Sequence, residues 1–191
     1  MSDMIPFEKS AELTVKDLKG SLISAKQEMS SGDVIPFLKL TKQGVWEYGA
    51  DQVEIEKDSE WALNPLSLQH GWISWGEGEV LGEAMVPIAA PRPALADMEE
   101  TGEKWDEQIS VQMCCVKGVD KGVNVLYKTT SRGGKQAMGK YLSALEAQLD
   151  VDQDKIVAVY QLDQSSYPHK KYGKIYTPVF TNKDWMSMAG K

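Results

Sequence analysis

The residues that could take part in catalysis are few, and their spacing is wrong for it. His70 and His169 lie in loop-forming surroundings; neither belongs to a helical HExxH pair, and no cysteine lies at metal-ligand spacing to either. Cys114 and Cys115 are adjacent in the strand-like run ISVQMCCV, where alternation places one in the core and the other partly at the surface. We therefore expect no metal site and no cofactor.

Two short motifs are similar to catalytic signatures, but each lacks an essential residue. RGGKQ is similar to the end of a phosphate-binding loop, yet Thr129 replaces the first glycine of GxxxxGK[ST] and Gln136 replaces its hydroxyl. QVEIEK resembles the acidic-x-Lys signature of metal-dependent nucleases, yet Ile55 stands where a carboxylate is needed. No serine or cysteine lies in a nucleophile elbow. The sequence predicts a protein that is not an enzyme, with a site assembled from scattered acids as an alternative.

Binding chemistry is better represented, above all in SSYPHKKYGKIYTPVF, which carries three lysines, three tyrosines and no acid. Alternation along KYGKIYTPVF gives one small, β-branched face that suits a core. The other face is aromatic and cationic and consists of Tyr172, Lys174, Tyr176 and Phe180, with Lys170 and Lys171 alongside. Aromatic rings stack on unpaired bases for about 1–3 kcal/mol each, and lysines follow the phosphates. This face predicts binding of single-stranded nucleic acid, unless its rings pack under a loop or a helix.

A second candidate surface is the run VLYKTTSRGGK. Lys128 lies on its strand, and Arg132 and Lys135 flank a glycine pair that leads into a helix. Free backbone N–H groups at such a helix start can hold a phosphate. The alternative is that the glycines only make a turn.

The tryptophans form a third candidate group. Trp46 and Tyr48 share a strand face behind Lys39 and Lys42, and Trp72 and Trp75 flank GWISWG. Six tryptophans in 191 residues are too many to expect all of them to be fully buried, so some rings could extend a stacking track. Trp61 and Trp105 lie among acids and are poor candidates for contact with DNA.

Charge is distributed unevenly along the chain. Residues 1–110 carry 9 Lys+Arg and 21 Asp+Glu, a net of -12, whereas residues 111–191 carry 12 and 7, a net of +5. The asymmetry favours a basic face on an acidic body, although acids crowded into loops would also explain it. The longest apolar run is far shorter than the roughly 18 residues that span a bilayer, and MSDMIPFEKS lacks the features of a signal peptide. We expect no membrane partner and a cytoplasmic location.

The elements that would position these residues are mostly short strands. β-branched and aromatic runs recur from residue 34 onward, EQISVQMCCV and KGVNVLYKTTS suggest a hairpin, and the proline-rich stretch 80–105 suggests a long connecting loop. Residues 131–149 have apolar residues at helical spacing. We predict a mainly β fold, an OB-like antiparallel barrel with one packed helix and long loops. Residues 34–191 would form this single domain, after an N-terminal arm or short helix in residues 1–33.

Several segments together resemble a known family. WEYGA, ALNPLSLQHGWISWG, GEAMVPIAAPRP, TTSRGGKQA and SSYPHKKYGKIYTPVF are similar to small proteins from the replication and recombination regions of tailed bacteriophages, some of them single-stranded-DNA-binding proteins with an OB-fold. The resemblance implies non-sequence-specific protection of single-stranded DNA in a bacterial host cell, with self-association along DNA as an open possibility. Many such proteins end in an acidic tail, whereas the segment NKDWMSMAGK is not acidic, so we expect no recruitment of partners through such a tail. The alternative is a protein-interaction module or DNA-mimic inhibitor of a host enzyme, motivated by the acidic first half.

Overall fold

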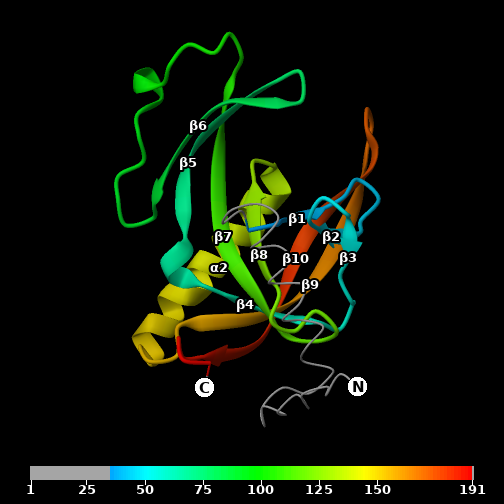
Figure 1. Ribbon diagram of the computed structural model, residues 1–191, viewed down its shortest axis with the longest axis vertical. Helices are drawn as coiled ribbons and strands as arrows, with labels where there is room; N and C mark the ends of the chain where they lie inside the picture. Colours follow the sequence, from blue (N-terminus) through cyan, green and yellow to red (C-terminus); the bar gives the residue numbers. More distant parts are fainter. Residues whose placement is uncertain (1–34, 191) are drawn as a thin grey trace, which may run out of the picture.

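A ten-stranded sheet and one α-helix make up residues 35–190, the part of the chain that the computed structural model describes (Figure 1). The strands are β1 (Phe37–Leu40), β2 (Trp46–Tyr48), β3 (Val53–Glu54), β4 (Glu60–Leu63), β5 (Gln69–Gly76), β6 (Glu79–Pro87), β7 (Trp105–Lys117), β8 (Asn124–Thr129), β9 (Val157–His169) and β10 (Gly173–Met186). The helix is α2 (Arg132–Val151), and two 3-10 turns are η1 (Pro65–Ser67) and η2 (Leu95–Asp97). The mainly β class is confirmed; the arm expected in residues 1–33 lies outside the described residues.

Two long strands, β7 and β9, determine the shape because each is 13 residues long and has different neighbours along its length. The first half of β7 pairs with β5 and the second half with β4, while β8 pairs along the other edge. The start of β9 pairs with β4, and its whole length pairs with β10. Both strands therefore extend past the centre of the sheet. Beyond it, β7 pairs with the β5–β6 hairpin, and β9 forms a hairpin with β10.

The strand order is β10-β9-β4-β7-β8-β1-β2-β3, with β5 and β6 branching from β7. The hairpin expected from EQISVQMCCV and KGVNVLYKTTS is confirmed as the antiparallel pair β7–β8. One pair departs from an antiparallel barrel, because β1 and β8 run parallel. The helix also lies between the eighth and ninth strands, not between the third and fourth as in an OB-fold.

The core lies between the concave side of the sheet and α2. Alternation along β7 buries Val111, Met113 and Cys115, and Cys114 lies partly exposed, as expected for adjacent strand positions. The helix contributes Met138 and Tyr141, which are 0% and 1% exposed. The helix expected over residues 131–149 is confirmed, and its N-cap is Ser131, whose Oγ accepts a hydrogen bond from Gly134 N at 3.0 Å.

The sheet curls but does not close into the barrel that the sequence suggested. β10 crosses β1 without pairing to it, and the two ends of the sheet meet through side chains instead. The Phe180 ring lies 6.2 Å from that of Trp46, and Trp46 Nε1 donates to Asp163 O at 3.0 Å. The backbone groups along this seam are left unpaired between β10 and β1, so the seam can open into a surface cleft.

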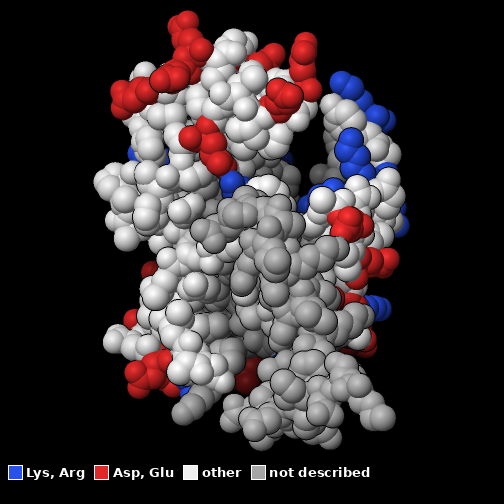
Figure 2. Space-filling view, in the orientation of Figure 1, with Lys and Arg blue, Asp and Glu red and all other residues white. Residues whose placement is uncertain are grey.

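Two projections leave the sheet on the same end of the molecule (Figure 1). The first, residues 69–104, consists of the β5–β6 hairpin and the loop that follows it; we call it the acidic arm because it holds seven acids and two basic residues. The second, residues 164–178, is the outer part of the β9–β10 hairpin; we call it the basic arm because it holds three lysines and no acid. Figure 2 shows red atoms gathered over the first and blue atoms over the second.

The acidic arm corrects the expectation of a loop over residues 80–105. Glu79–Pro87 forms strand β6, which pairs with β5 along its length, and only residues 88–104 form a loop with the short turn η2. Pro87 is the last residue of β6, where the missing N–H interrupts no further pairing. The prolines therefore mark the end of a strand and not the absence of one.

Candidate nucleic-acid interface

A cleft of about 610 Å³ lies along the open seam, where the base of the basic arm faces β1 and the end of β8. Its volume is in the range typical of ligand sites. Its walls contain four lysines, three tyrosines and no acidic residue: Lys39, Leu40, Thr41, Lys42, Tyr127, Lys128, Thr129, Thr130, Ser131, Tyr172, Lys174, Ile175, Tyr176 and Pro178. A groove with cations, aromatic rings and hydroxyls suits a chain of phosphates and bases.

One wall of the cleft is Tyr176, whose ring lies over the turn that follows β1. A Cβ atom on Gly44 would lie 2.5 Å from the ring, so only glycine allows this approach, and its φ of +82° also favours glycine. Lys174 Nζ lies 4.9 Å from the centre of the same ring. The cation and the ring are therefore presented together at the mouth of the cleft.

The four cleft lysines differ in how far they are already paired. Lys128 Nζ lies 2.6 Å from Glu83 Oε1 and Lys39 Nζ lies 3.0 Å from Glu47 Oε1. Lys42 and Lys174 have no ion-pair partner among residues 35–190. The last two are thus the cations most available to a phosphate.

Tyr127 forms the floor of the cleft and continues into the core. Its ring contacts Trp46 and Phe180 at 5.8 Å and 5.6 Å, and burial raises the pKa of its hydroxyl to about 12, against a smaller opposing effect of a hydrogen bond with Thr129. The group is neutral at physiological pH. It gives the cleft an apolar, rigid base between the lysines.

The start of α2 lies beside the cleft, but its glycines serve packing. A Cβ on Gly134 would lie 1.9 Å from Thr129 Oγ1, and one on Gly133 would lie 2.6 Å from Thr177 Cγ2. Ser131 lines the cleft, whereas the exposed Arg132 does not. These contacts agree with the alternative in which the glycine pair allows a close turn between strand and helix.

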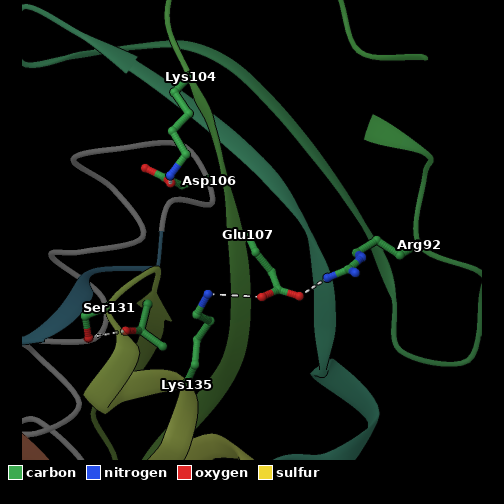
Figure 3. Close-up of polar contacts among 7 residues, drawn as sticks. Arg92, Lys104, Asp106, Glu107, Ser131 and Lys135 are labelled. Carbon is green, nitrogen blue, oxygen red and sulfur yellow. Dashed lines mark hydrogen bonds and ion pairs between the residues drawn. The ribbon is translucent and has the colours of Figure 1, made fainter. Parts of the chain in front are cut away.

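Lys135 points away from the cleft into an ion-pair network (Figure 3). Its Nζ lies 3.0 Å from Glu107 Oε2, and Arg92 pairs with the other oxygen of the same carboxylate. The two hydrogen bonds, from Lys135 and then from Arg92, lower the pKa of Glu107. The network ties the loop of the acidic arm to β7 and α2, so Lys135 has a structural partner already.

The tip of the basic arm presents further exposed groups. Tyr172 is 66% exposed and stacks on His169 at 4.9 Å, with Lys171 Nζ 5.2 Å from its ring centre. His169 Nδ1 accepts hydrogen bonds from the N–H groups of Lys171 and Tyr172, which closes the turn. Lys170 is exposed next to it. Tyr172 therefore belongs to the turn and extends the cleft outward.

The tryptophan group divides between the core and the other arm. Trp46 and Tyr48 are only 4% and 2% exposed, so neither ring has a free face for a base, and we exclude both from the candidate interface. Trp72 donates from Nε1 to Pro93 O at 2.8 Å and lies under Arg92, whose Cζ is 4.6 Å from the ring. Trp75 is 49% exposed but lies on the acidic arm. None of the four lines the cleft.

The aromatic face expected along β10 lines the cleft in its first part and packs on the core further along the strand. Lys174 and Tyr176 line the cleft, whereas Phe180, on the same side of the strand, packs on the core. The small, β-branched face expected in the core also departs from that expectation, since Ile175 lines the cleft and Val179 is 37% exposed. Leu40 and Thr41 line the cleft although the sequence did not single them out. The turn-like TKQG between two strands carried a signal for Thr41.

Comparisons with protein-family models, curated proteins and solved structures gave no match, so the fold and site stand on their own geometry. No group of three or more metal-binding side chains occurs within residues 35–190. Within the same range, no helix has the length and apolar character needed to cross a membrane.

Proposed function

We propose that the protein binds single-stranded nucleic acid, with single-stranded DNA as the expected ligand, through the lysine and tyrosine cleft. The observation that carries the proposal is the composition of the cleft wall, which has four lysines and no acid in a chain of net charge -7. Local positive charge on an acidic body attracts polyanions to one place while the rest of the surface repels them.

The chemistry of the cleft suits unpaired strands better than a duplex. Tyr172 and Tyr176 line the same cleft as the unpaired cations Lys42 and Lys174, and stacking on such rings needs bases that are free of their complement. Because stacking is tolerant of base identity, we expect weak sequence preference. Stoichiometric protection of single strands during bacteriophage replication or recombination is the role that the family resemblance implies.

The test is the anisotropy of a fluorescently labelled oligo-dT titrated with the purified chain at two salt concentrations. Four phosphate contacts would give a slope of log K against log salt of about -3. The double variant K42E/K174E should lower the affinity by about a hundredfold at low salt, at about 1.4 kcal/mol per reversed contact. An affinity that does not change with salt, or with this variant, would contradict the proposal.

A matched control is the double variant K121E/K140E. It changes the charge equally at exposed lysines, one in the β7–β8 turn at the other end of β8 and one on α2. Its affinity should stay close to that of the wild type. Equal losses in the two double variants would show attraction to overall charge and no defined site.

A second candidate function rests on the acidic arm. Its exposed acids could present the protein as a nucleic-acid mimic to a host enzyme. Absence of oligonucleotide binding, together with capture of one host protein that survives nuclease treatment and is lost when the arm's acids are neutralised, would favour this function over the first.

A further inference from the structure

The two arms carry charges that nothing else in the described part of the chain neutralises. Six acids of the acidic arm have no ion-pair partner there: Glu77, Glu79, Asp97, Glu99, Glu100 and Glu103. The three lysines of the basic arm also have no ion-pair partner among the described residues: Lys170, Lys171 and Lys174. Each arm is therefore an electrostatic surface that still lacks a partner.

Both arms also expose apolar side chains beside these charges. On the acidic arm Trp75, Val80 and Leu81 are 49%, 49% and 46% exposed near the hairpin turn. On the basic arm Tyr167 and Tyr172 are 47% and 66% exposed. Aromatic and aliphatic groups surrounded by charge are typical of protein interfaces.

Within one copy, no ion pair joins the two arms in the part of the chain that the structure describes. They project from the same end of the sheet, one to each side, and leave a gap between them (Figures 1 and 2). A second copy turned by 180° about an axis perpendicular to this view has its arms pointing back toward the first. In that position its acidic arm faces the basic arm of the first copy, and its basic arm faces the acidic arm.

We propose that two copies of this chain form a two-fold symmetric dimer in which the acidic arm of each docks on the basic arm of the other. A two-fold arrangement satisfies both arms of both copies at once and closes the assembly, and such dimers are the commonest symmetric oligomers. Charge complementarity selects the partner, and the exposed tryptophan, tyrosines and aliphatic side chains supply the contact. The dimer goes beyond the proposed function. Because docking on the basic arm would cover Tyr172 and Lys174, which also line the cleft, the dimer is tested without nucleic acid.

The experiment is sedimentation equilibrium of the full chain at about 50 mM and about 500 mM salt, between which screening shortens the range of charge interactions. We expect a dimer at low salt and a dissociation constant at least about tenfold higher at high salt. A monomer at low salt and high protein concentration would overturn the proposal.

Charge-swap variants show whether the arms make the contact. The acid-to-lysine variant E79K/E99K/E100K has two basic arms, and the lysine-to-acid variant K170E/K171E/K174E has two acidic arms. Each alone should be monomeric at low salt, because like charges then face each other. An equimolar mixture should form a heterodimer, since both contacts regain opposite charges. Failure of the mixture to associate, with both variants folded by circular dichroism, would overturn the proposal.

A control with the same change of charge is E146K/D150K/D154K, at exposed positions on and just beyond the second half of α2. It should dimerise like the wild type. Loss of the dimer in this variant would show that net charge, and not the arms, governs association, and would overturn the proposal as well.

Discussion

The two arms are both built on hairpins, yet a loop packs over the hairpin of the acidic arm, whereas the outer part of the basic arm is exposed to solvent. The loop of the acidic arm is held over β5 and β6 by side-chain contacts: His70 Nε2 to Ala90 O at 2.9 Å, Trp72 Nε1 to Pro93 O at 2.8 Å, Ser74 Oγ to Thr101 Oγ1 at 2.7 Å, and Trp105 Nε1 to Glu99 O at 3.0 Å. On the basic arm all residues from Gln164 to Lys174 are exposed. The side chains of the β5–β6 hairpin therefore stabilise the fold, whereas those at the tip of the β9–β10 hairpin are free to contact a ligand.

The packing difference predicts opposite responses to removal of an aromatic ring. Trp72→Ala removes a half-buried ring, its hydrogen bond to Pro93 and its contact with Arg92, and should lower the free energy of unfolding by about 2–3 kcal/mol. Tyr172→Ala removes an exposed ring and should change that free energy by less than about 0.5 kcal/mol. Urea denaturation followed by circular dichroism measures both. Similar losses of unfolding free energy in the two variants would contradict the inference that only the acidic arm is packed.

For ligand binding, removal of a ring from the basic arm should have a larger effect than removal of a ring from the acidic arm. Tyr176→Ala deletes a ring face at the cleft and should weaken oligo-dT binding by about 1–2 kcal/mol, or roughly five- to thirtyfold. Tyr176→Phe keeps the ring and serves as the control, with affinity near that of the wild type. Anisotropy titration measures both variants, and Trp72→Ala, at a residue that does not line the cleft, should bind normally once folded. A loss in Tyr176→Phe equal to that in Tyr176→Ala would point to the hydroxyl instead of stacking.

The smallest expected effect concerns the link between the acidic arm and the body. Lys135 and Arg92 lower the pKa of Glu107 from its ordinary 4.5, so the ion pairs stabilise the fold above that pH. This stability is lost as the pH falls through the lowered pKa. Because the Glu107 side chain is 41% exposed, the contribution is only about 0.5 kcal/mol.

The corresponding measurement compares the wild type with Glu107→Gln by urea denaturation from pH 7 to pH 3. The wild type should be slightly more stable at pH 7, and the difference should shrink as the pH falls below 4.5 toward the lowered pKa of Glu107. A difference that stays constant across this range would mean that packing of the side chain, and not its charge, ties the arm to the body.

Much of the local structure could be predicted from sequence because its causes are local. Apolar spacing over residues 131–149 predicted α2, and alternation in ISVQMCCV correctly separated Cys115 from Cys114. The loop expected over 80–105 was wrong in its first part, since a proline at the end of a strand is compatible with pairing. Barrel closure was not observed, because closure depends on pairing between segments distant in the chain.

The candidate site shows the same division. The segment around Lys174 and Tyr176 was chosen from its composition, and the structure places both in the cleft. Trp46 and Tyr48 have the same residue types and alternation, yet they lie in the core. Residue type and strand period cannot separate these cases, since they do not show which face of a strand another element covers.

By itself, the sequence determined the mainly β class, the helix, and a basic, aromatic segment in an acidic chain, because each follows from neighbours along the chain. Only the tertiary structure decided that Lys42, Lys128 and Lys174 line one cleft, and that the two arms leave the same end of the sheet with opposite charge. Curling of the sheet brings residues more than a hundred positions apart to one seam. Pairing of β10 with β9 and not with β1 leaves that seam open.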